Sequence, residues 1–449
     1  MFKEFEEVSS KAWKQQIQFD LNGKDYNQTV NWISNEGIRV RPFYNSDEKV
    51  RDDIYVPDEW NICQFIEIND EYESNELLIS LINKEVYDFT IKFQKDVCDL
   101  EILFDKINLE YINLYIQTDC LKSPILEHLN DFSEKNKCNL NLDIDIFGRF
   151  TETGNWILSK KHDVENLKKI LNVFSGFKSI VQLKSTVFQN SGANIIQEIA
   201  YTMLLGDLYI SIFGDKIISK INFEIAIGSN YFFEIAKLQS YRILWKTITS
   251  YYKKPIDNLH IIGVPSKRNK TIYEYNSNIV RTTSENMAAI LGGVNSIKNF
   301  NYDNLFKKEN KFSNRISINQ LLILKHEANI SKVKNPISGS YYISYLINQI
   351  SDQSYDLFKE LDENGNLIDH LYSGLIQKKI KENAIKEQHD FDTCNEIIVG
   401  ANRFINPSEK IKGQCDIDPF LSRNVKTLIE PLVERRLASK IEKNKFLNE

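Results

Sequence analysis

Short β-like runs that alternate with longer helical stretches are the feature that most constrains how this chain can fold. Apolar runs occur at residues 88–93, 111–117, 142–147, 179–184, 223–228 and 259–264, with two less regular ones at 296–300 and 333–335. Patterns with helical spacing stand between or after them, at 194–205, 231–252, 283–291, 317–327 and 341–360. Parallel strands joined by helical crossovers close into a barrel when eight units are present. The sequence therefore predicts an α/β fold of the (β/α)8 TIM-barrel class.

The pattern divides the chain into three parts. We expect an N-terminal arm or extension at 1–45, the barrel at 46–405, and a charged, helical C-terminal tail at 406–449. Residues 10–20 predict a short amphipathic helix, because Trp13, Ile17 and Leu21 recur at helical spacing. An arm rich in aromatic residues and without a core of its own packs either on its own barrel or on a partner. The sequence leaves both open.

Composition excludes several classes of function. The net charge is −6 with both signs well mixed, so we expect no binding to nucleic acid. No run of about 18 apolar residues occurs, and the acidic N-terminus lacks a signal-peptide core, so no membrane association is expected. The six cysteines lack CxxC spacing and indicate reduced thiols. Together these features predict a cytoplasmic protein.

Local motifs assign no chemistry to the barrel. The phosphate-binding, zinc-protease and nucleophile-elbow motifs are missing, and the six histidines never pair at metal-ligand spacing. Asp143 and Asp145 alternate along a predicted strand and could face the barrel interior, but a structural role is favoured for both. From these motifs alone the prediction is an α/β barrel of unknown chemistry.

Longer strings, in order along the chain, resemble the methylmalonyl-CoA mutase family. Residues 232–245 (FFEIAKLQSYRILW) resemble the family's F-x-E-I-A-K-x-R-A-x-R-x-L-W helix, and residues 278–297 resemble N-I-V-R-T-x-x-E-A-x-A-A-x-x-G-G. Further matches lie at 32–44, 315–327, 333–342 and 397–402. The resemblance implies a subunit of an isomerase that interconverts methylmalonyl-CoA and succinyl-CoA by adenosylcobalamin-dependent radical chemistry.

Active members of that family combine a substrate barrel with a C-terminal cobalamin domain, whose D-x-H-x-x-G motif supplies the cobalt ligand. Here only 47 residues follow Asn402, and the string at 369–374 (DHLYSG) has the wrong spacing. We therefore expect no C-terminal cobalamin-binding domain, and no cofactor or metal bound by this chain. Adenosylcobalamin is expected in the partner subunit.

The family's substrate-binding positions have also changed. Alignment on the matching strings places Phe65 at the active-site tyrosine, Val187 at the catalytic histidine, Ile262 at a second histidine and Val264 at a glutamine. Each change replaces a hydrogen-bonding group with an apolar one, and losing one such donor typically costs about 10²–10³ in rate. We expect a degenerate site with no catalytic residue, inside a barrel filled by side chains.

This combination resembles the smaller, non-catalytic subunits of heterodimeric family members. The expected partner is the catalytic large subunit of a methylmalonyl-CoA mutase, in a heterodimer. Two alternatives remain from the residues: a catalytic acyl-CoA mutase barrel that works with a separate cobalamin-binding chain, and a free-standing pseudoenzyme barrel with a new ligand.

Overall fold

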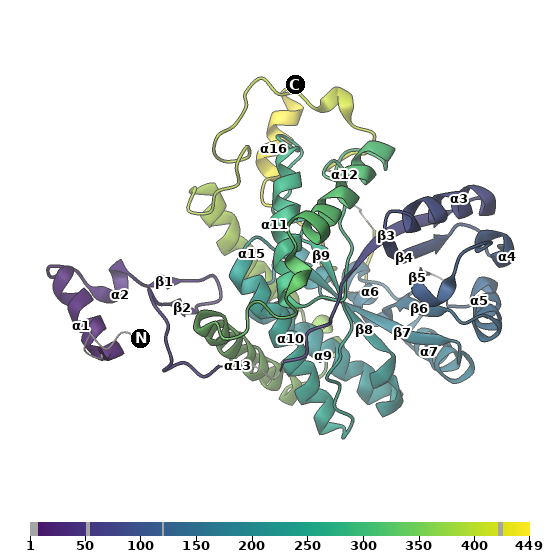
Figure 1. Cartoon of the computed structure of the whole chain (residues 1–449), viewed down its shortest axis with the longest axis horizontal. Helices are drawn as coiled ribbons and strands as arrows, with labels where there is room; N and C mark the ends of the chain where they lie inside the picture. The colour runs from purple at the N-terminus through teal and green to yellow at the C-terminus, as the bar shows by residue number, and fades with distance from the viewer. Residues whose placement is uncertain (1–7, 51–53, 119–120, 421–424) are drawn as a thin grey trace.

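The computed structural model describes residues 8–50, 54–118, 121–420 and 425–449, so the first seven residues of the arm and Cys120 lie outside the described parts. Eight parallel strands form a closed barrel in the order β10-β3-β4-β5-β6-β7-β8-β9, which confirms the predicted fold class (Figure 1). They are β3 (Asn61–Ile68), β4 (Val86–Phe93), β5 (Asn113–Gln117), β6 (Asn139–Ile144), β7 (Phe177–Lys184), β8 (Ile221–Ile227), β9 (Ile261–Pro265) and β10 (Ser296–Ile297).

The structure differs from the prediction at the two ends of this strand series. The first barrel strand is β3, which was not among the predicted strands, and residues 333–335 form no strand. The barrel closes where Ser296 on β10 pairs with Asn61 on β3. A strand of a parallel barrel is buried on both faces. Ile62 and Cys63, which point to opposite faces of β3, are each 1% exposed and meet that requirement, whereas Val333 is 59% exposed.

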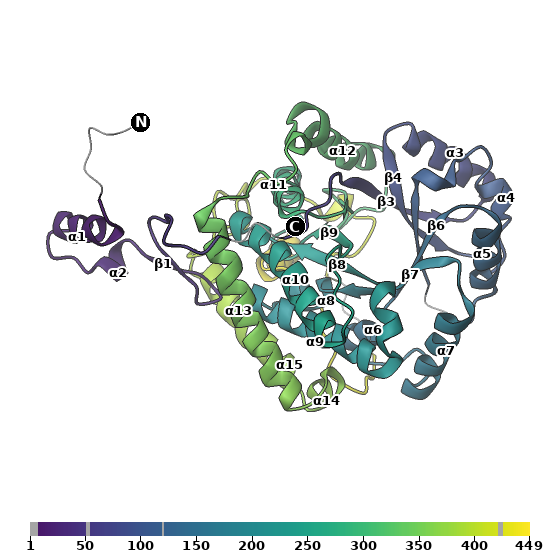
Figure 2. The same ribbon diagram turned by 60° about the horizontal axis from the view of Figure 1, so that its bottom comes forward.

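Helices surround the barrel on its outside (Figures 1 and 2). They are α3 (Glu71–Ile82), α4 (Leu100–Leu103), α5 (Pro124–Lys135), α6 (Ile146–Thr153), α7 (Lys160–Val173), α8 (Thr186–Ser191), α9 (Ile195–Phe213), α10 (Tyr231–Tyr251), α11 (Ser277–Gly292), α12 (Lys311–Leu322), α13 (Tyr341–Glu363), α14 (Leu367–Tyr372), α15 (Leu375–Asp392) and α16 (Ser439–Leu447). The five helices predicted from spacing are confirmed, with boundaries that differ by up to eight residues, as at the end of α9. The one predicted at 317–327 begins within α12 and continues as a π-helical turn at Ile323–Glu327.

Helix α9 is long and apolar enough to span a membrane by length and composition. However, 78% of its most apolar window is buried inside the protein, where α9 packs against α10 and α13. The helix starts at a capping box formed by Asn194 and Gln197, which satisfies its first free amides. It is therefore a core helix of the barrel's outer layer.

The arm contains α1 (Ser10–Asp20), α2 (Tyr26–Thr29) and a hairpin of β1 (Trp32–Ile33) and β2 (Arg39–Val40). Both views show α1 and α2 set apart from the barrel, with the hairpin between them and α13 (Figures 1 and 2). The hydroxyl of Tyr345 on α13 donates to the Arg39 carbonyl at 2.9 Å, which ties the hairpin to the barrel. No residue of α1 is buried, and Trp13 packs on Phe43 with ring centroids 3.8 Å apart.

Residues 425–438, which we call the strap, cross the carboxyl end of the barrel strands. Their backbone amides donate to carbonyls in α6 and at its C-cap, in α8 and in the loop after β9, and the strap's own Ile429 and Leu432 are buried. The bonds are Leu428 to the Gly154 carbonyl (3.0 Å), Leu432 to Thr151 (3.0 Å), Arg435 to Asn190 (2.8 Å) and Leu437 to Arg268 (3.0 Å). The strap thus covers part of the face on which TIM barrels carry their active sites.

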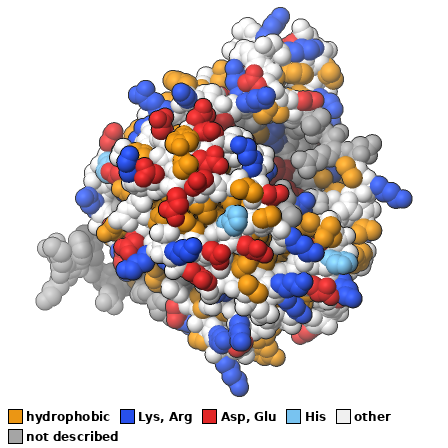
Figure 3. Space-filling model, turned by 90° about the vertical axis from the view of Figure 1, so that its right-hand side faces the viewer, with side chains coloured by type: hydrophobic (Ala, Val, Ile, Leu, Met, Phe, Trp, Pro, Cys, Tyr) orange, Lys and Arg blue, Asp and Glu red, His pale blue; other side chains and the backbone are white. Residues whose placement is uncertain are grey.

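Acidic and basic side chains are interspersed on the flank of the molecule seen in Figure 3, with hydrophobic side chains between them. This mixture agrees with the even charge balance of the sequence and differs from the single-sign patch typical of nucleic-acid-binding surfaces.

Candidate functional site

Three of the four degenerate positions face the inside of the barrel. Ile262 and Val264 alternate along β9 and share a hydrophobic cluster with Cys63 and Tyr115. Phe65 lies two residues after Cys63 on β3, so both side chains point to the same face. The structure therefore brings residues from β3, β5 and β9 together at the barrel axis.

Val187 takes a different place from the other three. It lies on α8, the short helix that directly follows β7, and is 8% exposed at the carboxyl end of the barrel. It belongs to the main core cluster rather than to the small cluster around Cys63.

A polar layer, not foreseen from the sequence, crosses the amino end of the barrel. Asp88 on β4 accepts hydrogen bonds from Asn113 Nδ2 at 2.8 Å, Asn61 Nδ2 at 3.0 Å and the Ser296 hydroxyl. Burial nevertheless raises the pKa of Asp88 to about 6, because three neutral donors do not replace the hydration of a carboxylate. The layer joins β10, β3, β4 and β5 by side chains alone.

Tyr115 on β5 and His260, just before β9, close the same end. The Tyr115 hydroxyl lies 2.7 Å from His260 Nε2. In the order of strands around the barrel, three strands separate β5 from β9 on either side, so these two residues meet across its full width. Burial, then the charges of Arg242 and Lys178, lower the pKa of His260 to about 4. The imidazole is therefore neutral at physiological pH.

An ion-pair layer crosses the carboxyl half of the barrel. Lys184 on β7 pairs with Asp143 on β6 at 2.8 Å, and Lys298 pairs with Glu224 on β8, which also accepts from Gln182 at 3.2 Å. Burial alone would lower the pKa of Lys184, but the negative charges of Asp143 and Glu224 outweigh it and raise that pKa. Both lysines are charged, and their carboxylate partners hold them in place.

The sequence pointed to only part of this layer. Strand alternation singled out Asp143, which does face the interior. Asp145 does not belong to the layer, because it caps α6 by accepting from the Gly148 amide at 2.7 Å and the Tyr209 hydroxyl at 2.8 Å. Lys184 and Lys298 were not predicted as interior residues; the signal for them is a lysine at the end of a strand or directly after it. The interior thus holds buried charged groups beside the apolar cluster of Cys63, Tyr115, Ile262 and Val264.

Two further buried ion-pair clusters lie behind the loops at the carboxyl end. Lys237 on α10 pairs with Glu234 at 2.6 Å and with Glu198 on α9 at 3.0 Å. Burial raises the pKa of Glu198 to about 7, although the charge of Lys237 opposes the shift. The second cluster pairs Lys270 with Glu285 at 2.7 Å.

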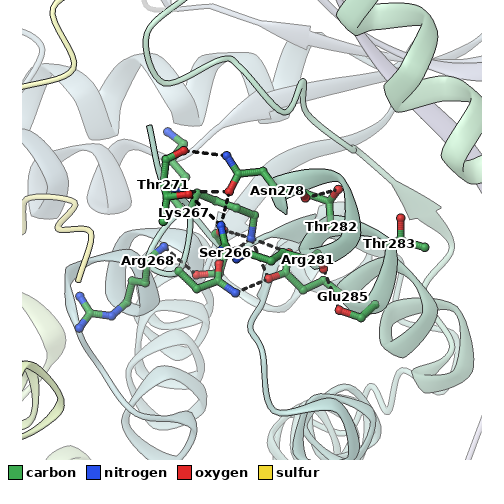
Figure 4. Close-up of polar contacts among 12 residues, drawn as sticks. Ser266, Lys267, Arg268, Thr271, Asn278, Arg281, Thr282, Thr283 and Glu285 are labelled. Carbon is green, nitrogen blue, oxygen red and sulfur yellow. Dashed lines mark hydrogen bonds and ion pairs between the residues drawn. The ribbon is translucent and has the colours of Figure 1, made fainter. Parts of the chain in front are cut away.

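Figure 4 shows how the second cluster joins the loop after β9 to α11. The Asn278 side chain donates to the Thr271 carbonyl at 2.8 Å and accepts from its amide at 3.1 Å. Arg281 Nη1 donates to Thr271 Oγ1 at 2.9 Å. These bonds fix the loop and leave none of their members poised for chemistry.

The string at 369–374 does not present its histidine as a cobalt ligand. His370, in the string closest to the family's ligand motif, is buried on α14, and its Nε2 is 2.8 Å from the Leu361 carbonyl oxygen. That nitrogen is committed to a backbone bond inside the helical layer. His370 is therefore not available to bind cobalt.

Comparisons with known proteins agree with this architecture. A family profile described as methylmalonyl-CoA mutase matches residues 95–444. A methylmalonyl-CoA mutase small subunit from Porphyromonas gingivalis is 30% identical over 98% of this chain and 77% of its own length. The methylmalonyl-CoA mutase of Rhizobium meliloti is 26% identical over 91% of this chain and 66% of its own length. The human mitochondrial mutase is 25% identical over 92% of this chain, which spans only 63% of that relative. On these matches and on its closed parallel barrel, the chain belongs to the methylmalonyl-CoA mutase family.

Proposed function

We propose that this chain is a structural, non-catalytic subunit of an adenosylcobalamin-dependent methylmalonyl-CoA mutase. The contact between Tyr115 and His260 across the barrel carries the proposal, because it occupies the axis at one end. The ion-pair layer of Lys184, Asp143, Lys298 and Glu224 occupies the axis at the other. Side chains therefore occupy the barrel axis at both its amino end and its carboxyl half, and they leave the interior to structural contacts rather than to a substrate.

The chemistry of the degenerate positions supports the same proposal. Phe65, Ile262 and Val264 line the interior with apolar groups that cannot donate a hydrogen bond to a thioester carbonyl. The neutral His260 is bonded to Tyr115, and the lysines are bonded to carboxylates. Adenosylcobalamin and the acyl-CoA substrate then belong to a catalytic large subunit, with which this chain forms a heterodimer in the cytoplasm.

Activity and assembly measurements test the proposal together. The purified chain should not shift the corrin absorbance spectrum of adenosylcobalamin and should form no succinyl-CoA from methylmalonyl-CoA. Co-expressed with the large subunit, it should elute as a 1:1 complex, with an interface of more than about 2,000 Å² in total. Succinyl-CoA formed by this chain alone would instead indicate a catalytic barrel. Separate elution of the two chains at micromolar concentration would indicate a free-standing barrel.

A further inference from the structure

A cavity of about 540 Å³ opens at the carboxyl end of the barrel, away from its axis. Its walls come from the arm hairpin, the loops that follow β7, β8 and β9, the end of α15 and the segment just after it. This size is sufficient for a ligand or for a side chain of another protein. None of the four degenerate positions lines it. We call it the hairpin pocket.

Carboxylates outnumber cations on the walls of the hairpin pocket. The acidic lining residues are Glu36, Glu198, Glu234, Glu387, Asp390 and Glu396, against Arg268, Arg281 and Lys386. All three cations are already engaged within the chain: Arg268 with Glu387, Arg281 with the Val399 carbonyl at 2.6 Å, and Lys386 with the Asn35 carbonyl at 3.0 Å. The three positive charges of the lining are thus already bound by acceptor groups of the chain itself.

Three of the carboxylates are in the opposite situation. Among the described residues, the side chains of Glu36, Asp390 and Glu396 have no hydrogen-bond or ion-pair partner. They also repel their neighbours: burial and then the charge of Asp390 raise the pKa of Glu396. Burial, with a smaller contribution from Glu36, raises the pKa of Glu387. A cation entering the pocket would relieve this repulsion.

The entrance of the pocket is apolar. Trp32 and Ile33 on the hairpin are 51% and 63% exposed, and Ile397 and Val399 on the segment after α15 are 41% and 50% exposed. Four large hydrophobic side chains exposed around one cavity mark an interaction surface rather than scattered surface residues. The pocket therefore combines an apolar entrance with an excess of unpaired negative charge.

We propose that the hairpin pocket is a docking site for a segment of a partner polypeptide that presents an arginine between apolar residues. The guanidinium matches paired carboxylates geometrically and is less strongly hydrated than an ammonium group, which suits entry past an apolar rim. Its planar face also packs on an exposed indole such as that of Trp32. The flanking apolar side chains cover Ile33, Ile397 and Val399. The proposal does not depend on the proposed function, because it uses no residue of the barrel axis.

Calorimetric titration of the full chain tests this with three probes. These are the peptide Ac-Leu-Arg-Leu-NH2, its neutral counterpart Ac-Leu-Gln-Leu-NH2, and arginine amide without flanking residues. The arginine peptide should bind at least about tenfold more tightly than either of the others, since it alone uses both the carboxylates and the rim. The double variant Glu36→Gln/Asp390→Asn should weaken it by about tenfold. The matched control is Glu76→Gln on α3, an exposed glutamate outside the pocket, which should leave it unchanged.

Several outcomes would overturn the proposal. No binding of the arginine peptide at millimolar concentration removes the docking site. Equal binding of the glutamine peptide means that only the apolar rim matters, and equal binding of arginine amide means a site for small cations. Unchanged affinity in the double variant removes the role of the carboxylates. Thermal melting of each variant shows that it is folded, and neither substituted carboxylate has a partner within the described residues to lose.

Discussion

The Tyr115 hydroxyl lies 2.7 Å from Nε2 of His260, although the two residues belong to opposite sides of the barrel. The distance implies that the barrel is closed at this level by side chains. Because the pKa of His260 is lowered to about 4, the neutral imidazole accepts or donates one bond without carrying charge into the interior. The contact therefore stabilises the fold, and its removal should lower the free energy of unfolding.

Tyr115→Phe should lower the free energy of unfolding by about 1–2 kcal/mol at pH 7.5, because it leaves a buried imidazole nitrogen without its partner. Urea denaturation followed by circular dichroism measures this. Tyr111→Phe is the matched control, since Tyr111 is 72% exposed and should change stability by less than about 0.5 kcal/mol. Equal stability of the two variants would mean that a water molecule replaces the Tyr115 hydroxyl as the partner of His260. Water would then have access to the barrel axis.

Asp88→Asn should stabilise the protein at neutral pH. The folded pKa of Asp88 is raised to about 6, above the unfolded value of about 3.9, so its favourable contribution is complete below pH 4 and is lost as pH rises through 6. An asparagine retains an acceptor oxygen for Asn61 and Asn113, and its amide can donate to the Ser296 hydroxyl. The variant should gain about 2–3 kcal/mol over the native chain at pH 7.5, and the difference should shrink towards zero near pH 4. A difference that does not vary with pH would show that Asp88 does not titrate in this range.

Lys237→Met should destabilise the barrel by about 3–5 kcal/mol, because it leaves Glu198 and Glu234 buried without a counter-charge. Lys246→Met on the same helix provides the comparison. Lys246 pairs with Asp257 at the surface, where an ion pair contributes about 0–1 kcal/mol. Thermal melting of both variants measures the contrast. Similar melting points would mean that the two glutamates take up protons at little cost.

Deletion of residues 1–30 should weaken association with the large subunit by at least about tenfold while leaving the barrel folded. Helix α1 has no buried residue, Phe19 is 77% exposed, and the hairpin that contacts α13 lies beyond the deletion. Burial of Trp13, Ile17 and Leu21 on a partner would contribute roughly 1.5–3 kcal/mol each before ordering costs. Residues 1–7 of this segment lie outside the described parts.

Dissociation constants for the full-length and truncated chains measure the effect of that deletion, with the melting point of each chain alone as the control. Unchanged affinity with a lower melting point would assign the arm to its own barrel. A second variant, Phe19→Ala, should weaken the complex and leave the melting point of the isolated chain unaltered.

The amino-acid sequence by itself determined the elements and the class of fold. Periodicity is a local property, so α1 was predicted at its observed bounds and α10 and α13 within a few residues of theirs. Ordered matches such as 232–245 and 278–297 likewise sufficed to place the chain in its family, because those strings encode the packing of α10 and α11 on the barrel.

The tertiary structure alone decided which groups meet. The pairing of β3 with β10 closes the barrel and joins Asn61 to Ser296, which are 235 positions apart in the sequence. No local sequence pattern shows that the barrel closes through these two strands rather than through a strand at 333–335. The Tyr115–His260 contact, the ion pairs of Lys184 and Lys298, and the hairpin pocket each combine side chains from distant segments. Hydrogen bonds and charge pairs depend on distances of about 3 Å, and only the closed barrel sets those distances.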